Sequence, residues 1–172
     1  LYGDGYRFQD VTADQWFYGA VDYMASEGYI QGISQSHFGP ALNMNRASFV
    51  TLLGRLAGVP EEQVQTQFVD VPADSFYSGY VAWAAKTGIT TGVDTTHFNP
   101  TGKCNRAQVV TFLWRAVGKP GSTATESGFT DVTNTQEFYY DAVLWAVENQ
   151  ITNGMGDGTF GVLKTCNRAQ VV

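Results

Sequence analysis

The sequence predicts a mainly α fold in which three tandem helix-loop-helix repeats surround a central three-helix bundle. The first observation is a pattern, Phe-x-Asp-Val, that returns about every sixty residues, at 8–11, 68–71 and 129–132. The second is the motif Asn-Arg-Ala near the end of each copy, at 45–47, 105–107 and 167–169. The third is a helix-like spacing of apolar residues after both motifs. Self-similarity at a fixed period is typical of repeat architectures.

Composition narrows the class of protein. The 172 residues are 44% apolar, 14% aromatic and 15% charged, which argues for a folded chain. The net charge of −6 argues against nucleic acid as a partner, because nucleic-acid-binding domains are usually basic. No apolar run approaches the roughly 18 residues of a membrane helix, so we expect no membrane insertion.

The repeats divide the chain at 1–60, 61–120 and 121–172, and we expect the three to form one structural unit. The third repeat is truncated, because residues equivalent to 51–58 of the first repeat are absent from it. The chain starts without a charged and apolar leader. We therefore expect a processed protein or a piece of a larger one, continuing past Val172.

An outer helix is expected after each Asp-Val pair. Apolar residues at i, i+4 and i+8 form one stripe, which includes the aromatic residues Trp16, Phe76 and Phe138. Gly28 and Gly88 are expected to end the first two helices. In the third repeat Gln150 takes the place of the glycine, and Asn149 is expected to adopt the left-handed turn instead.

A glycine-rich loop follows each outer helix. The loop glycines Gly32, Gly92 and Gly154 each precede a phenylalanine by six residues. Such a fixed aromatic residue is expected to be a plug that holds the loop against the core.

The histidines and cysteines match no zinc pattern, so neither a metal nor a cofactor is expected. Cys104 and Cys166 take the place of Met44, which favours buried free thiols over a disulfide.

The inner helix is expected to start at Asn-Arg-Ala. Asn45, Asn105 and Asn167 are good N-caps, and Gln108 and Gln170 complete a capping-box pattern. The helices that follow are apolar on nearly every side, so they belong at the centre of the molecule. The third one is only a stub.

The arginine of this motif stands in the first turn of a helix, in all three copies: Arg46, Arg106 and Arg168. A cation costs about 0.3–1 kcal/mol there, because the helix dipole is positive at that end. One explanation is an anion bound by the arginine together with free helix N–H groups. The other is an internal ion pair with the repeated Asp10, Asp70 and Asp131. The spacing does not decide between them; only the ion pair predicts a clear loss of stability when the arginine is replaced.

Trp83 and Trp145 are repeat equivalents of Tyr23 on the outer helix. They are candidates for stacking on a sugar or for an interface, and the alternative is that they are core residues. Acidic residues are spread by repeat and not gathered into a pair of carboxylates, so no catalytic residues and no enzyme activity are expected.

Taken together, these motifs resemble the S-layer homology domain, in three tandem copies that cover nearly the whole chain. The resemblance implies one pseudo-threefold unit with a central three-helix bundle and grooves between copies. It also implies a cell-wall anchor that binds secondary cell-wall polysaccharide, often pyruvylated. The family's binding arginine maps onto Arg46, Arg106 and Arg168, and its loop glycine onto Gly32, Gly92 and Gly154. Here Asn-Arg-Ala-Ser or Asn-Arg-Ala-Gln replaces the usual Thr-Arg-Ala-Glu, so the glutamate's charge is missing.

We therefore expect a non-catalytic module that binds an anionic cell-wall polysaccharide at the bacterial cell surface. It would be covalently part of a larger surface protein. The alternative is a module for protein–protein contact or self-assembly in a surface layer.

Overall fold

Each repeat supplies one outer helix, and the first two also supply a longer inner helix. The computed structural model describes residues 7–172. The outer helices are α1 (Tyr18–Ser26), α3 (Ser78–Lys86) and α5 (Tyr140–Glu148), and the inner ones are α2 (Arg46–Leu56) and α4 (Arg106–Ala116). The third inner segment is a single 3-10 turn, η1 (Arg168–Gln170). Within the described part, strand-like pairing is limited to isolated bridges, so the predicted mainly α fold is confirmed.

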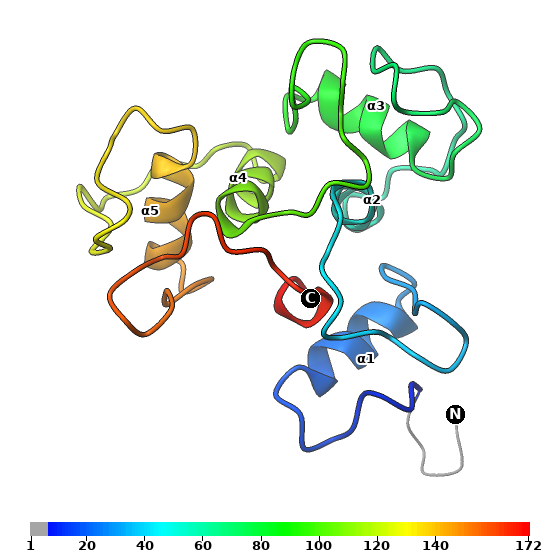
Figure 1. Ribbon diagram of the computed structural model, residues 1–172, viewed down its shortest axis with the longest axis horizontal. Coiled ribbons are helices and arrows are strands. Elements are labelled where there is room, and N and C mark those ends of the chain that lie inside the picture. Colours follow the sequence, from blue (N-terminus) through cyan, green and yellow to red (C-terminus); the bar gives the residue numbers. More distant parts are fainter. Residues whose placement is uncertain (1–6) are drawn as a thin grey trace.

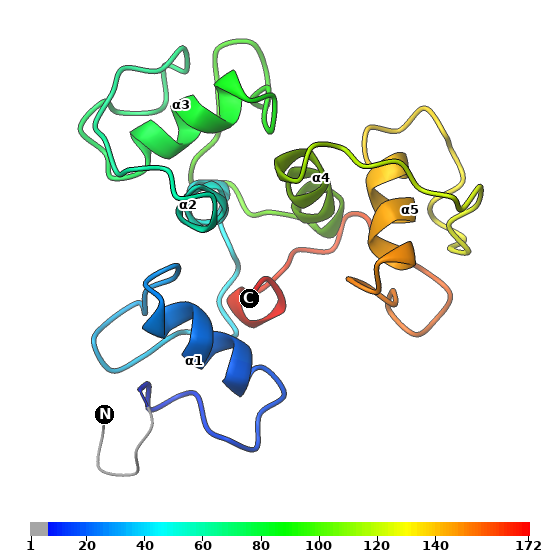
Figure 2. The same cartoon turned by 180° about the vertical axis from the view of Figure 1, so that it is seen from behind.

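Each lobe of the molecule takes its two helices from different repeats. α3 packs against α2, and α5 packs against α4. At the first contact a Cβ added to Gly54 of α2 would lie within 3.0 Å of the Tyr80 ring of α3, so glycine permits this close approach. Figures 1 and 2 show three lobes around the centre, with η1 beside α1 in the third. The sequence repeats and the packed lobes are therefore out of phase by one helix.

The centre of the molecule is closed by a ring of three backbone hydrogen bonds. The Met44 N–H donates to the Cys166 carbonyl, Cys166 donates to Cys104, and Cys104 donates to Met44, each at 2.9 Å. These residues directly precede the three Asn caps, so the strand-like segments before the inner helices meet at one pseudo-threefold axis.

The two cysteines are buried and free, as predicted. Burial raises the pKa of the Cys104 thiol to about 12 and also raises that of Cys166. Both cysteines lie at the pseudo-threefold axis, where equivalent positions of the repeats come close together. Their backbones are hydrogen-bonded while their thiols remain unlinked.

The inner helices have the predicted caps and the predicted burial. Asn45 accepts a hydrogen bond from the Ser48 N–H, and Asn105 and Asn167 each form a capping box with Gln108 and Gln170. α2 is buried along most of its length. α4 is more open toward its C-terminal end: Leu113 is half-buried, whereas the equivalent Leu53 of α2 is buried. Leu113 lines a groove together with Val171 and Val172, the two residues after η1.

Two details of the outer helices differ from expectation. Trp16, Phe76 and Phe138 do not lie in the buried stripe: each precedes its helix by two residues and is largely exposed. The chain forms turns before each helix, and these turn the aromatic side chain away from the core. After α5 the left-handed residue is Gln150, with φ 58°, while Asn149 has an ordinary φ of −91°.

The loop phenylalanines are plugs, as predicted. Phe38, Phe98 and Phe160 are at most 2% exposed, and each ring lies 5.6–5.8 Å from the phenylalanine of the Phe-x-Asp-Val motif.

The longest helices within residues 7–172 have 11 residues, too few to cross a membrane.

Candidate functional site: three grooves between repeats

The repeated arginine reaches across to the next repeat. The Arg46 Nε donates to the Phe98 carbonyl at 2.8 Å, and its guanidinium carbon lies 4.7 Å from the centre of that ring. Arg106 makes the same pair of contacts with Phe160, at 2.7 and 4.7 Å. Arg168, in the last repeat, contacts Phe38 of the first in the same way. Its Nε donates to the Phe38 carbonyl at 2.9 Å, and its guanidinium carbon lies 4.5 Å from the centre of the ring. Each arginine therefore holds the loop plug of its neighbour.

The N–H groups at the start of the inner helices are already satisfied. In α2 the Arg46 N–H donates to the Gly102 carbonyl at 2.8 Å and the Ala47 N–H to Pro100 at 2.9 Å. The third N–H, of Ser48, is bound by the Asn45 cap. The other two helix starts follow the same pattern. The expectation of free helix N–H groups for an anion is wrong, so the guanidinium groups would have to bind it.

The internal ion pair is also absent. Among the described residues no Asp10, Asp70 or Asp131 carboxylate lies within 4.0 Å of an arginine nitrogen. The Asp70 carboxylate instead accepts the N–H groups of Phe98 at 2.8 Å and Asn99 at 2.7 Å. The aspartate and the arginine thus bind opposite ends of the same phenylalanine, the first at its N–H and the second at its carbonyl.

Three grooves lie around these contacts, one for each loop, and we number them by the repeat that supplies the loop. The first groove is lined by Tyr29, Ile30, Gln31, Gly32, Ser48, Thr51, Leu52, Arg55, Phe76 and Arg168. The second is lined by Arg46, Thr90, Thr91, Gly92, Val93, Gln108, Thr111, Phe112, Arg115 and Phe138. The third is lined by Arg106, Val109, Val110, Leu113, Ile151, Thr152, Phe160, Cys166, Gln170, Val171 and Val172.

The grooves are positive in an acidic chain. Five of the six arginines line them, and among the described residues no Asp or Glu lines any of the three grooves. The first and second grooves each hold two arginines, one from the preceding repeat and one from their own inner helix. The charge pattern therefore fits an anionic ligand.

The second groove has a volume of about 420 Å³, and its two arginines make few hydrogen bonds. Arg46 is only 3% exposed, and its Nη2 has no hydrogen-bond partner in the part of the chain that the structure describes. Arg115 donates one bond, from Nη1 to the Ile89 carbonyl at 3.2 Å. Burial lowers the pKa of both arginines, which means that their surroundings give them less than the solvation of water. An anion would compensate for that loss.

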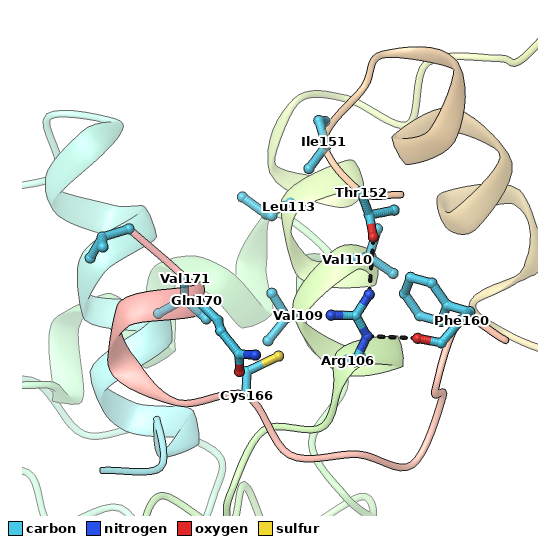
Figure 3. Close-up of a pocket in the computed structure, with 11 residues that line it drawn as sticks. Arg106, Val109, Val110, Leu113, Ile151, Thr152, Phe160, Cys166, Gln170 and Val171 are labelled. Carbon is cyan, nitrogen blue, oxygen red and sulfur yellow. Dashed lines mark hydrogen bonds between the residues drawn. The ribbon is translucent and has the colours of Figure 1, made fainter. Parts of the chain in front are cut away.

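In the other two grooves the same Nη2 atom is occupied. Arg168 donates it to the Gln31 carbonyl in the first groove. There Arg55 also has a partner, Glu61, at 3.5 Å. In the third groove Arg106 donates Nη2 to the Thr152 hydroxyl at 3.0 Å, and valine and leucine side chains make up much of the lining (Figure 3).

The predicted site residues are only partly brought together. Gly32 and Gly92 line grooves with an arginine, whereas Gly154 is not among the lining residues of the third groove. All three glycines have a packing role, because an added Cβ would lie within 3.0 Å of the motif phenylalanine ring and a loop carbonyl. Trp83 and Trp145 line none of the three grooves: they lie on outer helices, and Trp145 is 8% exposed within the core.

Two arginines and two aromatic residues of the grooves were not among the predicted site residues. Arg55 and Arg115 are repeat equivalents ten residues after the N-cap, and their recurrence was the available signal. Phe76 and Phe138 were assigned to the core because their spacing fits a helix. Among residues 7–172 no three His, Cys, Asp or Glu side chains gather closely enough to hold a metal ion.

Comparison with known proteins agrees with this arrangement. The S-layer homology domain profile matches the chain three times, at residues 7–50, 67–110 and 128–172. The chain is 31% identical over 110 residues to the S-layer protein EA1 of Bacillus anthracis, covering 63% of this chain and 13% of that protein. It is 24% identical over 167 residues to the exoglucanase XynX of Acetivibrio thermocellus, covering 95% of this chain and 15% of the enzyme.

A third relative is the amylopullulanase of Thermoanaerobacterium thermosulfurigenes, 23% identical over 167 residues, which cover 95% of this chain and 9% of the enzyme. The chain thus spans a small part of each of these proteins. Other homologues are S-layer and surface-layer proteins of bacteria, with which a cell-surface location is consistent. The three matches cover most of the chain, and it therefore belongs to the S-layer homology domain family, with three tandem copies.

Proposed function

We propose that this chain is a non-catalytic module that anchors a larger surface protein to the bacterial envelope by binding an anionic, pyruvylated cell-wall polysaccharide. The observation that carries the proposal is the gathering of five of six arginines into grooves that, within residues 7–172, are lined by no Asp or Glu. A pyruvyl ketal presents a carboxylate, and a guanidinium binds a carboxylate through two parallel hydrogen bonds.

The second groove is the strongest candidate for the binding site. Its Arg46 has an unpartnered Nη2, and Arg115 provides a second cation in the same lining. Because Arg46 is buried, a bound carboxylate would be held directly by the more accessible Arg115, and the buried charge of Arg46 would add to the attraction. The first groove follows, with its charge partly neutralised by Glu61, and the third has a single arginine.

The test is titration calorimetry of the chain with purified pyruvylated wall polysaccharide and with the same polymer after mild acid removal of pyruvate. We expect binding to the first and at least tenfold weaker binding to the second. Arg115→Gln should weaken binding to the intact polymer by about tenfold, the equivalent of one charge-assisted hydrogen bond. Arg7→Gln is the matched control, because Arg7 is exposed and pairs with Asp22 at 4.0 Å, outside the grooves.

Equal binding of both polymers, or equal effects of the two variants, would contradict a carboxylate site in the grooves. The rival function is self-assembly within a surface layer. It predicts concentration-dependent oligomers in sedimentation experiments and no affinity for the polymer.

A further inference from the structure

An exposed aromatic residue precedes each outer helix by two positions. Trp16 is 76% exposed, Phe76 50% and Phe138 54%. A large apolar side chain in water contributes little to folding, yet the same type of residue stands at this point in all three repeats. Exposed aromatic rings beside polar groups are typical of binding surfaces.

Two of these rings lie in the positive grooves. Phe76, from the second repeat, lines the first groove, and Phe138, from the third repeat, lines the second. Each of these grooves therefore combines residues of three repeats: an arginine from the preceding one, a loop and inner helix from its own, and an aromatic ring from the following one.

The rings are held in place before any ligand arrives. Phe76 packs edge-to-face against Tyr77, with ring centres 5.2 Å apart and planes at 88°. Phe138 packs in the same way against Tyr139, at 5.1 Å and 85°. Because the next residue fixes each ring, little side-chain freedom remains to be lost on binding.

We propose that Phe76 and Phe138 are sugar-stacking residues, which contact the ring of the saccharide whose carboxylate is bound by the arginines of the same groove. This inference rests on the proposed function. One face of a pyranose ring carries C–H groups that pack on an aromatic face, while its charged substituent needs a cation. The two grooves contain both elements, so they select a charged sugar over a small carboxylate without a ring.

The third groove supplies an internal control. Trp16, the equivalent aromatic residue, is not among the residues that line it. There η1 and the two residues after it take the position that α2 and α4 occupy in the other grooves. Trp16 is also more exposed than the other two, so its replacement tests the loss of an exposed aromatic ring without a change in either arginine-pair groove.

The experiment compares Phe138→Ala, Phe76→Ala and Trp16→Ala, with calorimetry against a methyl glycoside that carries a pyruvyl ketal. We expect the first two to weaken binding by about threefold to tenfold, the loss of one aromatic contact, and their combination to weaken it further. Trp16→Ala should bind as the native chain does. Phe138→Trp should keep affinity and Phe138→Leu should lose it, since only the former retains a ring.

A second ligand separates stacking from charge. Free pyruvate should compete with the glycoside, and its own dissociation constant should be the same for the native chain and for Phe138→Ala. Pyruvate has no sugar ring that could stack on Phe138. The melting temperatures of Phe138→Ala and Trp16→Ala should fall by similar small amounts, since each variant loses one exposed ring that packs edge-to-face on the next residue.

The outcomes are distinct. If the native chain binds neither the glycoside nor the polymer, the proposed function fails. If the native chain binds and Arg115→Gln weakens it, but Phe76→Ala and Phe138→Ala bind like the native chain, only the stacking role is overturned. An effect of Trp16→Ala as large as that of Phe138→Ala would overturn it as well.

Discussion

Arg46 and Phe98, which belong to different repeats and are 52 residues apart, are joined twice. The Nε of Arg46 donates to the Phe98 carbonyl at 2.8 Å, while the guanidinium carbon lies 4.7 Å from the centre of the Phe98 ring. On the far side of the same residue the Phe98 N–H donates to Asp70 at 2.8 Å. Arg46 therefore has two roles: it holds the loop of the neighbouring repeat in place, and it contributes positive charge to the groove.

This double role leads to a prediction for Arg46→Ala. The variant should lose stability as well as affinity, because both contacts with Phe98 disappear. We expect about 1–3 kcal/mol less unfolding free energy, from urea titration. Arg7→Ala, at an exposed ion pair, should change stability by less than about 0.5 kcal/mol. A native-like stability of Arg46→Ala would show that the arginine serves binding alone.

The loop glycine gives a second prediction, with a matched pair in the same repeat. Gly92 has φ +87°, and an added Cβ would lie within 3.0 Å of the Phe68 ring and two loop carbonyls. Gly88 has a similar φ of +73° but open space around it. Both alanine variants bear the cost of a left-handed backbone, about 1–2 kcal/mol, and only Gly92→Ala adds a collision. Thermal melting should therefore rank Gly92→Ala clearly below Gly88→Ala, and equal losses would rule out the packing role.

Asp131 makes stability depend on pH. Partial desolvation raises the pKa of its carboxyl, but the N–H groups of Phe160, Gly161 and Val162 outweigh this and bring it below the ordinary 3.8. The unfolded chain therefore binds the proton first, and this contribution to stability is present above about pH 4 and is lost as the pH falls through the lower, folded value.

The measurement is the melting temperature as a function of pH, for the native chain and for Asp131→Asn. The variant should be less stable at neutral pH and should show a shallower decline below about pH 4. Parallel curves for the two proteins would mean that Asp131 contributes nothing to the acid transition.

Each lobe combines helices from two repeats, which predicts that a single repeat does not fold on its own. A fragment of residues 61–120 contains α3 and α4, which pack against α2 and α5 of the flanking repeats. We expect its circular dichroism to show no cooperative melting, whereas the full chain melts in one transition. A sharp transition of the isolated fragment would contradict the single structural unit.

Much of this architecture can be read from local sequence. The Asn caps, the loop plugs and the buried inner helices depend on residues a few positions apart, and all were predicted. The position of Phe138 was missed because helical spacing alone does not tell where the first turn of a helix starts. The destination of each arginine was also missed. Its partner lies 52 to 130 residues away, and no local pattern encodes a contact between one repeat and the loop of the next.

The circle of arginine contacts has a mechanical consequence for an anchor. Arg168 contacts Phe38 across 130 residues of chain, so the last repeat is fastened to the first. A pulling force between the two ends would therefore act first on the contacts between the third and the first repeat, and these have to break before the repeats can separate one after another.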